Sequence, residues 1–216
     1  LSRGLGDVYK RQVMEGKRRK SRIAVLASGG GSNSRAILKH FSEGSGSEVA
    51  EVVWVCTNRP KAGVREVASS FGVEQTCMAK ADMNEGKLLE GLKFRQVEWV
   101  ALAGFLLKVP PEVCEVFEGR IINVHPSLLP KYGGTGMYGM NVHRAVKESN
   151  EGISGMTIHM VNHHYDDGDI LFQGEVDLHP DDTAEDIAAK VLELEHRHYP
   201  QVLEGLIRLE NGWDVR

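Results

Sequence analysis

Cysteine is scarce in this 216-residue chain, which contains only Cys56, Cys77 and Cys114. The three are far apart and odd in number, so they indicate neither a disulfide framework nor the paired spacing of a thiolate metal site. We therefore expect a protein of a reduced, cytoplasmic compartment.

The chain also lacks long apolar runs, and it has no excess of basic side chains after residue 22. No apolar stretch approaches the ~20 residues that cross a bilayer, so we expect no membrane association. Residues 1–22 hold eight basic and two acidic side chains, while the other 194 residues hold 18 basic and 28 acidic ones. A body with a net charge of −10 argues against a nucleic-acid surface.

The basic N-terminus stands apart from the rest of the chain. We expect residues 1–21 to form a disordered leader and residues 22–216 to form one domain, since this length is ample for a single core. Met14 is the expected native start, which makes the first 13 residues foreign sequence. A basic targeting or RNA-binding tail is the alternative.

Apolar runs alternate with helical patterns along the first 120 residues. Strands are predicted at residues 23–27, 49–56, 74–78 and 99–103, with helices near 62–71 and 84–94 and another opening at Pro111. Strands that alternate with helices are typical of an α/β protein. The prediction is a doubly wound, mostly parallel twisted sheet of Rossmann-like type.

The C-terminal third follows a different pattern. Residues 153–161 alternate as a long strand, and residues 170–176 are its expected antiparallel hairpin partner. Before them, residues 131–139 are rich in glycine and are predicted to form a surface loop near the site.

A long helix is predicted at the C-terminus. Asp182 and Glu185 resemble a capping box at its start, and Pro200 should kink or loosen it. Glu195 lies inside the apolar stripe of this helix. Because an unpaired buried carboxylate is costly, Glu195 should meet a partner charge or a ligand amine, unless it lies at a solvent-exposed edge of the stripe.

Residues 121–125 form a further predicted strand, which carries two polar side chains on one face. Asn123 and His125 share that face because side chains alternate with a period of two, and Pro126 ends the strand. The carboxyl ends of strands are where open α/β sheets bind ligands. The alternative is that His125 is a satisfied core histidine and Asn123 a strand-end cap.

Residues 28–33, Ser-Gly-Gly-Gly-Ser-Asn, lie between the first strand and a helix. Glycines at such a junction let the backbone N–H groups point outward at a helix N-terminus, which is typical of a phosphate site. The loop matches neither the dinucleotide nor the Walker motif. A merely flexible turn is the alternative.

Histidines and aspartates gather in residues 163–169. A metal site or a carboxylate acting on a neighbouring group would each fit this composition. His159, His163 and His164 lack the ligand spacing of a metal site, so no metal is expected.

Taken in order, these motifs resemble the phosphoribosylglycinamide formyltransferases of purine synthesis, in their small monofunctional form. The resemblance covers about residues 22–209 and is carried by the glycine loop, Leu-Ala-Gly-Phe at 102–105, Asn-Val-His-Pro-Ser-Leu-Leu-Pro at 123–130, the aspartate turn, and Glu195-His196 with Tyr199-Pro200. The Asn-x-His-Pro motif is specific for folate-dependent formyl transfer, and the glycine loop indicates the glycinamide ribonucleotide branch.

The resemblance implies formyl transfer from 10-formyltetrahydrofolate to the glycine amine of 5-phosphoribosylglycinamide. Asn123 would stabilise the oxyanion, His125 would carry the proton, and Asp166 would hold the imidazole. It implies 10-formyltetrahydrofolate as co-substrate, with no tightly bound cofactor and no metal. Monomer or weak homodimer is the expected assembly.

Binding roles follow from the same resemblance. Gly31, Ser32 and Asn33 would bind the substrate phosphate, and Glu195 the substrate amine. The folate would lie against Leu106, Leu107, Lys108 and Val109, beside Asn123. The turn at 163–167 would close over the pterin ring.

The chain departs from the family pattern at several points. Residues 133–140 replace a more usual Pro-Gly and histidine pair, Leu107 stands where arginine is common, and the region around Asn84 lacks an arginine for the folate tail. Asp167 and Asp169 add negative charge beside Asp166. The alternatives are a formyltetrahydrofolate deformylase, a methionyl-tRNA formyltransferase and a non-catalytic phosphate-binding module.

Overall fold

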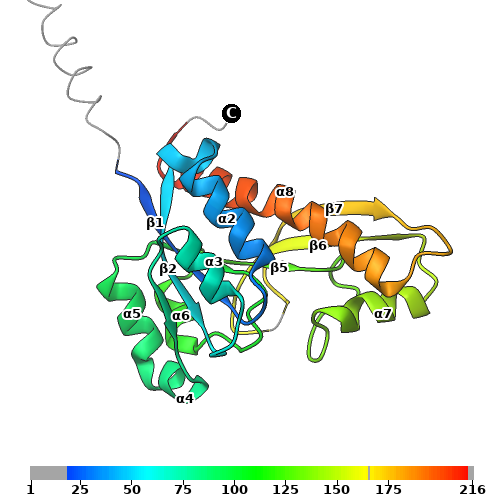
Figure 1. Cartoon of the computed structure of the whole chain (residues 1–216), viewed down its shortest axis with the longest axis horizontal. Coiled ribbons are helices and arrows are strands. Elements are labelled where there is room, and N and C mark those ends of the chain that lie inside the picture. Colours follow the sequence, from blue (N-terminus) through cyan, green and yellow to red (C-terminus); the bar gives the residue numbers. More distant parts are fainter. Residues whose placement is uncertain (1–18, 165, 214–216) are drawn as a thin grey trace, which may run out of the picture.

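One seven-stranded sheet organises the chain, in the order β3-β2-β1-β4-β5-β6-β7 (Figure 1). The computed structural model describes residues 19–164 and 166–213. The strands are β1 (Ser21–Ala27), β2 (Ala50–Thr57), β3 (Gln75–Cys77), β4 (Trp99–Leu102), β5 (Ile121–His125), β6 (Ile153–Met160) and β7 (Ile170–Asp177). β1 to β5 are parallel, and β6 and β7 continue the sheet antiparallel.

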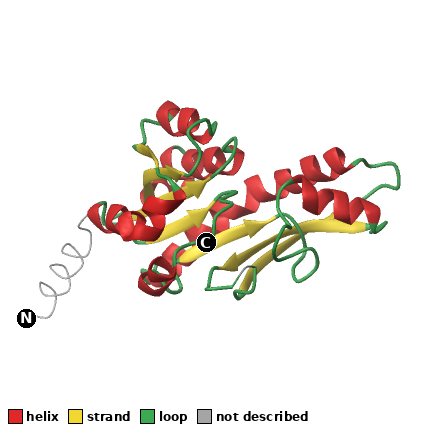
Figure 2. Ribbon diagram, turned by 90° about the horizontal axis from the view of Figure 1, so that it is seen from below, coloured by secondary structure: helices red, strands yellow, loops and turns green. Residues whose placement is uncertain are grey.

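Helices cover both faces of the sheet (Figure 2). They are α2 (Ser32–Ser42), α3 (Val64–Ser70), α4 (Lys80–Asp82), α5 (Leu88–Phe94), α6 (Pro111–Val116), α7 (Met140–Glu148) and α8 (Ala184–Glu210), with a 3-10 turn at Ser45–Glu48 and a π turn at Met83–Lys87.

Side-chain alternation in β1 explains the two layers. Ile23 and Val25 pack with α2, α3, α7 and α8, whereas Ala24 and Leu26 pack with α5 and α6 on the other face. A strand whose two faces are both buried is expected to be apolar, as residues 23–27 of β1 are. The predicted doubly wound, mostly parallel sheet with an antiparallel C-terminal hairpin is confirmed.

The predicted helix near 84–94 is shorter than expected. Gly86 adopts a φ of 88° inside the π turn, so the regular helix α5 begins only at Leu88. A positive φ is accessible to glycine at little cost, which is why the helical pattern is interrupted at this residue.

Helix α8 begins with a different capping box from the predicted one. The Thr183 hydroxyl accepts from the Asp186 N–H at 3.1 Å, and Asp186 Oδ2 accepts from the Thr183 N–H at 2.9 Å. The predicted cap at Asp182 is wrong, because the carboxylate of this residue accepts instead from the His179 N–H and from Lys190. The register of the cap is therefore one residue later.

Helix α8 also runs unbroken through Pro200, where a kink or loosening was predicted. Just before the proline, Tyr199 is fully buried, and its hydroxyl lies 3.0 Å from the Leu102 carbonyl oxygen and 2.9 Å from that of Ile122. The tyrosine thus joins α8 to the last residue of β4 and to the second residue of β5.

The predicted leader, residues 1–21, lies almost wholly outside the described residues. Strand β1 begins at Ser21, two residues earlier than predicted. Among the residues that the structure describes, no helix combines the length and the apolar character needed to cross a membrane.

Candidate active site

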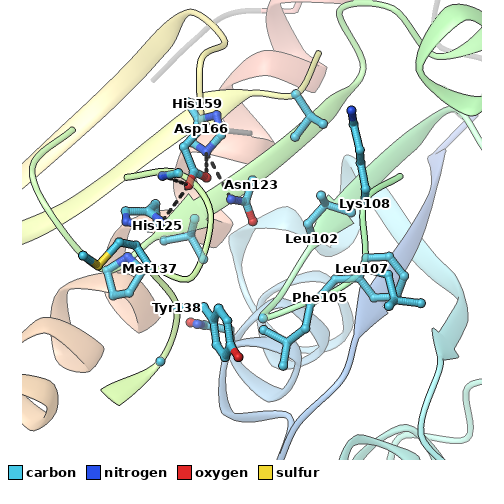
Figure 3. A pocket seen from close by; sticks show the side chains of 18 of the residues that line it. Leu102, Phe105, Leu107, Lys108, Asn123, His125, Met137, Tyr138, His159 and Asp166 are labelled. Atoms are coloured by element: carbon cyan, nitrogen blue, oxygen red, sulfur yellow. Dashed lines mark hydrogen bonds and ion pairs between the residues drawn. The ribbon is translucent and has the colours of Figure 1, made fainter. Parts of the chain in front are cut away.

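A cavity of about 530 Å³ opens at the carboxyl ends of β4 and β5 (Figure 3). Its walls come from the segment after β4, the end of β5, the loop at residues 134–139, the turn before β7 and one side of α8. This is the position at which open α/β sheets bind ligands. Segments far apart in the sequence therefore share one crevice.

Asn123 and His159 face each other at this end of the sheet, as partners in the β5–β6 register. Asn123 Nδ2 lies 3.1 Å from His159 Nε2, and His159 Nδ1 lies 2.8 Å from the Met160 carbonyl oxygen. A carbonyl can only accept, so Nδ1 carries the proton and Nε2 accepts from the Asn123 amide. The second N–H of that amide is left for a ligand.

His159 is suited to this role because it stays neutral. The residue is 2% exposed, and burial lowers its pKa despite the nearby Asp166 carboxylate. A neutral ring keeps the Nε2 lone pair that accepts from Asn123.

His125 is held by the loop that follows β5. Its Nε2 donates to the Tyr132 carbonyl oxygen at 2.8 Å, while its Nδ1 lies 3.6 Å from Asp166 Oδ2. That separation permits electrostatic attraction but is too long for a hydrogen bond. Nδ1 is thus the nitrogen of His125 that is not committed to the backbone.

Asp166 lies between two imidazoles. Its Oδ2 accepts from the Gly134 N–H at 2.9 Å and faces His125, and its Oδ1 lies 3.6 Å from His159 Nε2 (Figure 3). The Asp166 side chain is 12% exposed, and the backbone of this residue has a positive φ of 52°. The Asp166 carboxylate therefore lies near His125 itself and near His159, the hydrogen-bond partner of Asn123.

The glycine loop lies between β1 and α2, as predicted. Gly31 has a φ of 86°, and a Cβ there would approach Val64 Cα to 2.7 Å. The Gly31 carbonyl accepts the first bond of α2 from Arg35 at 2.8 Å, so the N–H groups at the start of the helix are not used within it. Only glycine combines this φ with this close approach.

Asn33 and Glu195 form a buried pair beside that loop. Asn33 Nδ2 donates to Glu195 Oε2 at 2.5 Å, and Asn33 Oδ1 is buried without a partner among the described residues. Glu195 is 6% exposed, and burial raises its pKa to about 7 although the Asn33 hydrogen bond opposes the shift. The carboxyl group can therefore gain or lose a proton near neutral pH.

An apolar wall lies on the opposite side of the cavity from His125. Leu102, Phe105, Leu107 and Lys108 lie along it in Figure 3, and Leu106 and Val109 also line it. This wall suits a flat, largely apolar ring system. All five residues predicted to contact the folate, Asn123 included, thus line the cavity.

Comparison with known proteins agrees with this geometry. The profile of the family described as Formyl transferase matches residues 21–203, most of the chain. The chain belongs to the formyl transferase family.

Among similar members, the phosphoribosylglycinamide formyltransferase, chloroplastic, of Vigna unguiculata is 42% identical over 200 residues, which cover 90% of this chain and 64% of that protein. The chain thus spans less than two thirds of that relative. The phosphoribosylglycinamide formyltransferase of Bacillus subtilis is 34% identical, over 88% of this chain and 96% of its own length. The solved glycinamide ribonucleotide transformylase 1 of Symbiobacterium toebii superposes with a TM-score of 0.81 at 31% identity, covering 90% of this chain and 93% of that one.

Within this formyl transferase fold, the structure brings Asn123, His125 and Asp166 into one crevice, with Glu195 and Asn33 lining the same cavity. The Asn33 side chain is directed to Glu195, whereas the sequence assigned it to a phosphate. Of the turn at 163–167, His164 and Asp166 line the cavity, and Tyr165 lies outside the described residues.

Two histidines of the cavity were not given a role by the sequence. His159 was considered only as a metal ligand, although its place in a strand paired with β5 could have indicated the contact with Asn123. His143 on α7 is 5% exposed, lines the cavity, and has Nδ1 buried without a partner among the described residues. Burial and the neighbouring His125 lower its pKa.

Proposed function

We propose that this protein transfers the formyl group of 10-formyltetrahydrofolate to the glycine amine of 5-phosphoribosylglycinamide, a step of de novo purine biosynthesis. The observation that carries the proposal is the placement of Asn123, His125 and Asp166 in one cavity. The glycine loop and the apolar wall supply the two further features that such substrates need, an anion site and a site for a planar ring.

The reaction needs an oxyanion site, because amine attack on the formyl carbon places negative charge on its oxygen. The N–H of Asn123 that is not bonded to His159 is the donor proposed for this oxygen. His159 fixes the amide before the substrate arrives, so little reorganisation is required. Such preorganised donors contribute about 100- to 1000-fold in rate.

His125 is the proposed proton carrier. Its Nε2 is bonded to the Tyr132 carbonyl, so Nδ1 is the atom that would take a proton from the attacking nitrogen. The Nδ1 to Asp166 distance of 3.6 Å would shorten as the imidazole becomes cationic. Hydrogen bonds of catalytic groups are commonly longer in the unliganded state.

The binding roles follow the cavity walls. Gly31, Ser32 and Asn33 are proposed for the phosphate, through the free N–H groups at the start of α2. Glu195 is proposed for the substrate amine, whose positive charge would favour the ionised carboxylate. Leu106, Leu107, Lys108 and Val109, with Asn123, are proposed for the folate.

Further proposals concern the surroundings of the reaction. We propose a cytoplasmic enzyme that uses 10-formyltetrahydrofolate as co-substrate without a tightly bound cofactor or metal. Its partners would be the two small-molecule substrates, with no nucleic acid and no membrane, and it would act as a monomer or weak homodimer.

One assay tests the proposed function. Formation of tetrahydrofolate from 10-formyltetrahydrofolate would be followed with and without 5-phosphoribosylglycinamide. Turnover only with the ribonucleotide is the expected result. Equal turnover without it would indicate transfer to water, and no turnover in either case would overturn the proposal.

A further inference from the structure

Three loops of the site meet at the hydroxyl group of Ser28, the residue that follows β1. Ser28 Oγ donates to Asn58 Oδ1 at 2.6 Å and accepts from the Leu106 N–H at 2.9 Å. Its backbone N–H also donates to the Gly104 carbonyl oxygen at 3.0 Å. One residue thus joins the loops that follow β1, β2 and β4.

Ser28 has no access to solvent that could replace these bonds. The residue is 1% exposed, and its hydroxyl donates one hydrogen bond and accepts another. A buried polar group that loses its partners costs more than the bonds contribute when formed. The hydroxyl therefore fixes the relative position of the three loops.

Two of the three loops that Ser28 joins carry different proposed binding sites. Directly after it comes the glycine loop with Gly31, the proposed anion site, and Leu106 lies in the wall proposed for the folate. The backbone and side chain of Ser28 both bind the wall segment, at Gly104 and at Leu106. The glycine loop and the wall can shift relative to each other only by breaking these bonds.

We propose that Ser28 is a positioning residue that couples the two subsites, so that an anion on the glycine loop and a folate on the wall each increase the affinity for the other. The inference rests on the proposed function, because it takes the ligands of the two subsites from it. Coupling of this kind is reciprocal, since each ligand must change the affinity for the other by the same factor.

The third loop supports the same arrangement from the other side. The Val64 N–H donates to the Gly29 carbonyl at 3.2 Å, and a Cβ on Gly63 would lie 3.1 Å from the Gly30 carbonyl oxygen. The segment after β2 is thus packed on the glycine loop and is also held by Ser28 through Asn58. An anion that orders residues 29–31 would stabilise all three loops together.

The test measures binding rather than turnover. The Kd of tetrahydrofolate would be determined by titration calorimetry with inorganic phosphate and with chloride at equal ionic strength. For the natural chain we expect phosphate to lower the Kd about fivefold or more, at the low end of usual coupling. For Ser28→Ala we expect a change of twofold or less.

Three variants distinguish a loss of coupling from a nonspecific loss of folding or binding. Ser28→Thr keeps the hydroxyl and should restore part of the coupling. Ser70→Ala removes a hydroxyl that donates to the Val67 carbonyl of its own helix at 2.7 Å, outside the three loops that Ser28 joins, and should leave the coupling unchanged. Asn58→Ala removes the third-loop contact without touching Ser28, and it should weaken the coupling even if Ser28→Ala does not fold.

Each outcome bears on the inference. Undiminished coupling in a folded Ser28→Ala would overturn it, and if that variant does not fold, undiminished coupling in Asn58→Ala would do so. A natural chain in which phosphate leaves the Kd unchanged would also overturn it. If that natural chain nevertheless turns over both substrates, only the inference fails. If it does neither, the proposed function fails as well.

Discussion

The Asn123 amide donates to the Nε2 atom of His159 at 3.1 Å, between two strands that are paired in register. His159 is in turn fixed by its bond to the Met160 carbonyl. The chain thus determines the direction of the amide, because a ring nitrogen that accepts can face only the NH2 group. The amide that we propose as the oxyanion donor is therefore held in place in the absence of substrate.

Replacement of His159 tests this arrangement. We expect His159→Leu to lower kcat about tenfold or more, since an unfixed amide loses part of the 100- to 1000-fold contribution of such a donor. His159→Gln retains an acceptor and should lose less. Steady-state kinetics on both variants would check this, with circular dichroism to verify the fold. Equal kcat values for Leu and Gln would contradict the assignment.

Replacement of Asn123 should lower kcat more than replacement of His159. Asn123→Asp replaces the amide by a carboxylate that repels the developing oxyanion and cannot accept from a neutral His159. We expect kcat to fall about 100- to 1000-fold or more with little change in KM for either substrate. A loss confined to KM would show that Asn123 binds the substrates but does not stabilise the transition state.

The effects of substituting His125 and Asp166 on turnover should not be additive. We expect His125→Ala to keep the fold and to lose most of the turnover, because alanine offers no nitrogen to take the proton of the attacking amine. Asp166→Asn removes the charge that faces Nδ1 but leaves an oxygen for the Gly134 N–H. If the two act as a unit, the double variant should be little slower than His125→Ala alone. Unchanged turnover in His125→Ala would refute its role.

Glu195 gives a pH dependence of stability. Its pKa in the folded protein, about 7, lies above the ordinary value of 4.5, so the folded state binds more protons than the unfolded state between these values. The free energy of unfolding should therefore fall as the pH rises from 4.5 to 7, by up to about 3 kcal/mol, and stay low above 7.

Glu195→Gln removes this titration. Relative to the natural chain, the variant should gain stability at pH 8 and show a much smaller difference at pH 4.5. Urea unfolding across this range measures both. Parallel stability curves for the two proteins would mean that Glu195 keeps its ordinary pKa.

The glycine loop can be tested with matched substitutions. Gly31→Ala would force a Cβ to within 2.7 Å of Val64 Cα and would strain a φ of 86°. We expect the KM for 5-phosphoribosylglycinamide to rise about tenfold or more, from displacement of the N–H groups at the start of α2. Gly29→Ala meets nothing within 4 Å and should change it far less. Equal effects would indicate that the loop tolerates displacement.

The architecture was predictable because apolar alternation reports burial on two faces. Residues 23–27 of β1 are apolar throughout, whereas Met156, Ile158 and Met160 of β6 alternate with polar residues, and this difference in sequence separates the parallel part of the sheet from its hairpin. The boundaries were less predictable. Gly86 interrupts a helical pattern with a positive φ, and the cap of α8 uses Thr183 although Asp182 has the same chemistry one residue earlier.

The site was predictable where one strand carries two polar residues, and not where the partner comes from another strand. Asn123 and His125 follow from the alternation in β5, but the contact with His159 depends on the antiparallel register of β5 and β6. Likewise, the bond between Asn33 and Glu195 joins residues 162 positions apart. No local pattern encodes such a separation.

The contacts of Glu195 and Tyr199 on α8 restrict the number of residues between them. The two residues are one helical turn apart, so both face the sheet, one at the cavity and one at the carbonyls of Leu102 and Ile122. Each residue of a helix rotates its successors by about 100°. Deleting a single residue between Glu195 and Tyr199 would turn either the acid away from the cavity or the tyrosine away from the two carbonyls, so insertions and deletions should not fall between these two residues.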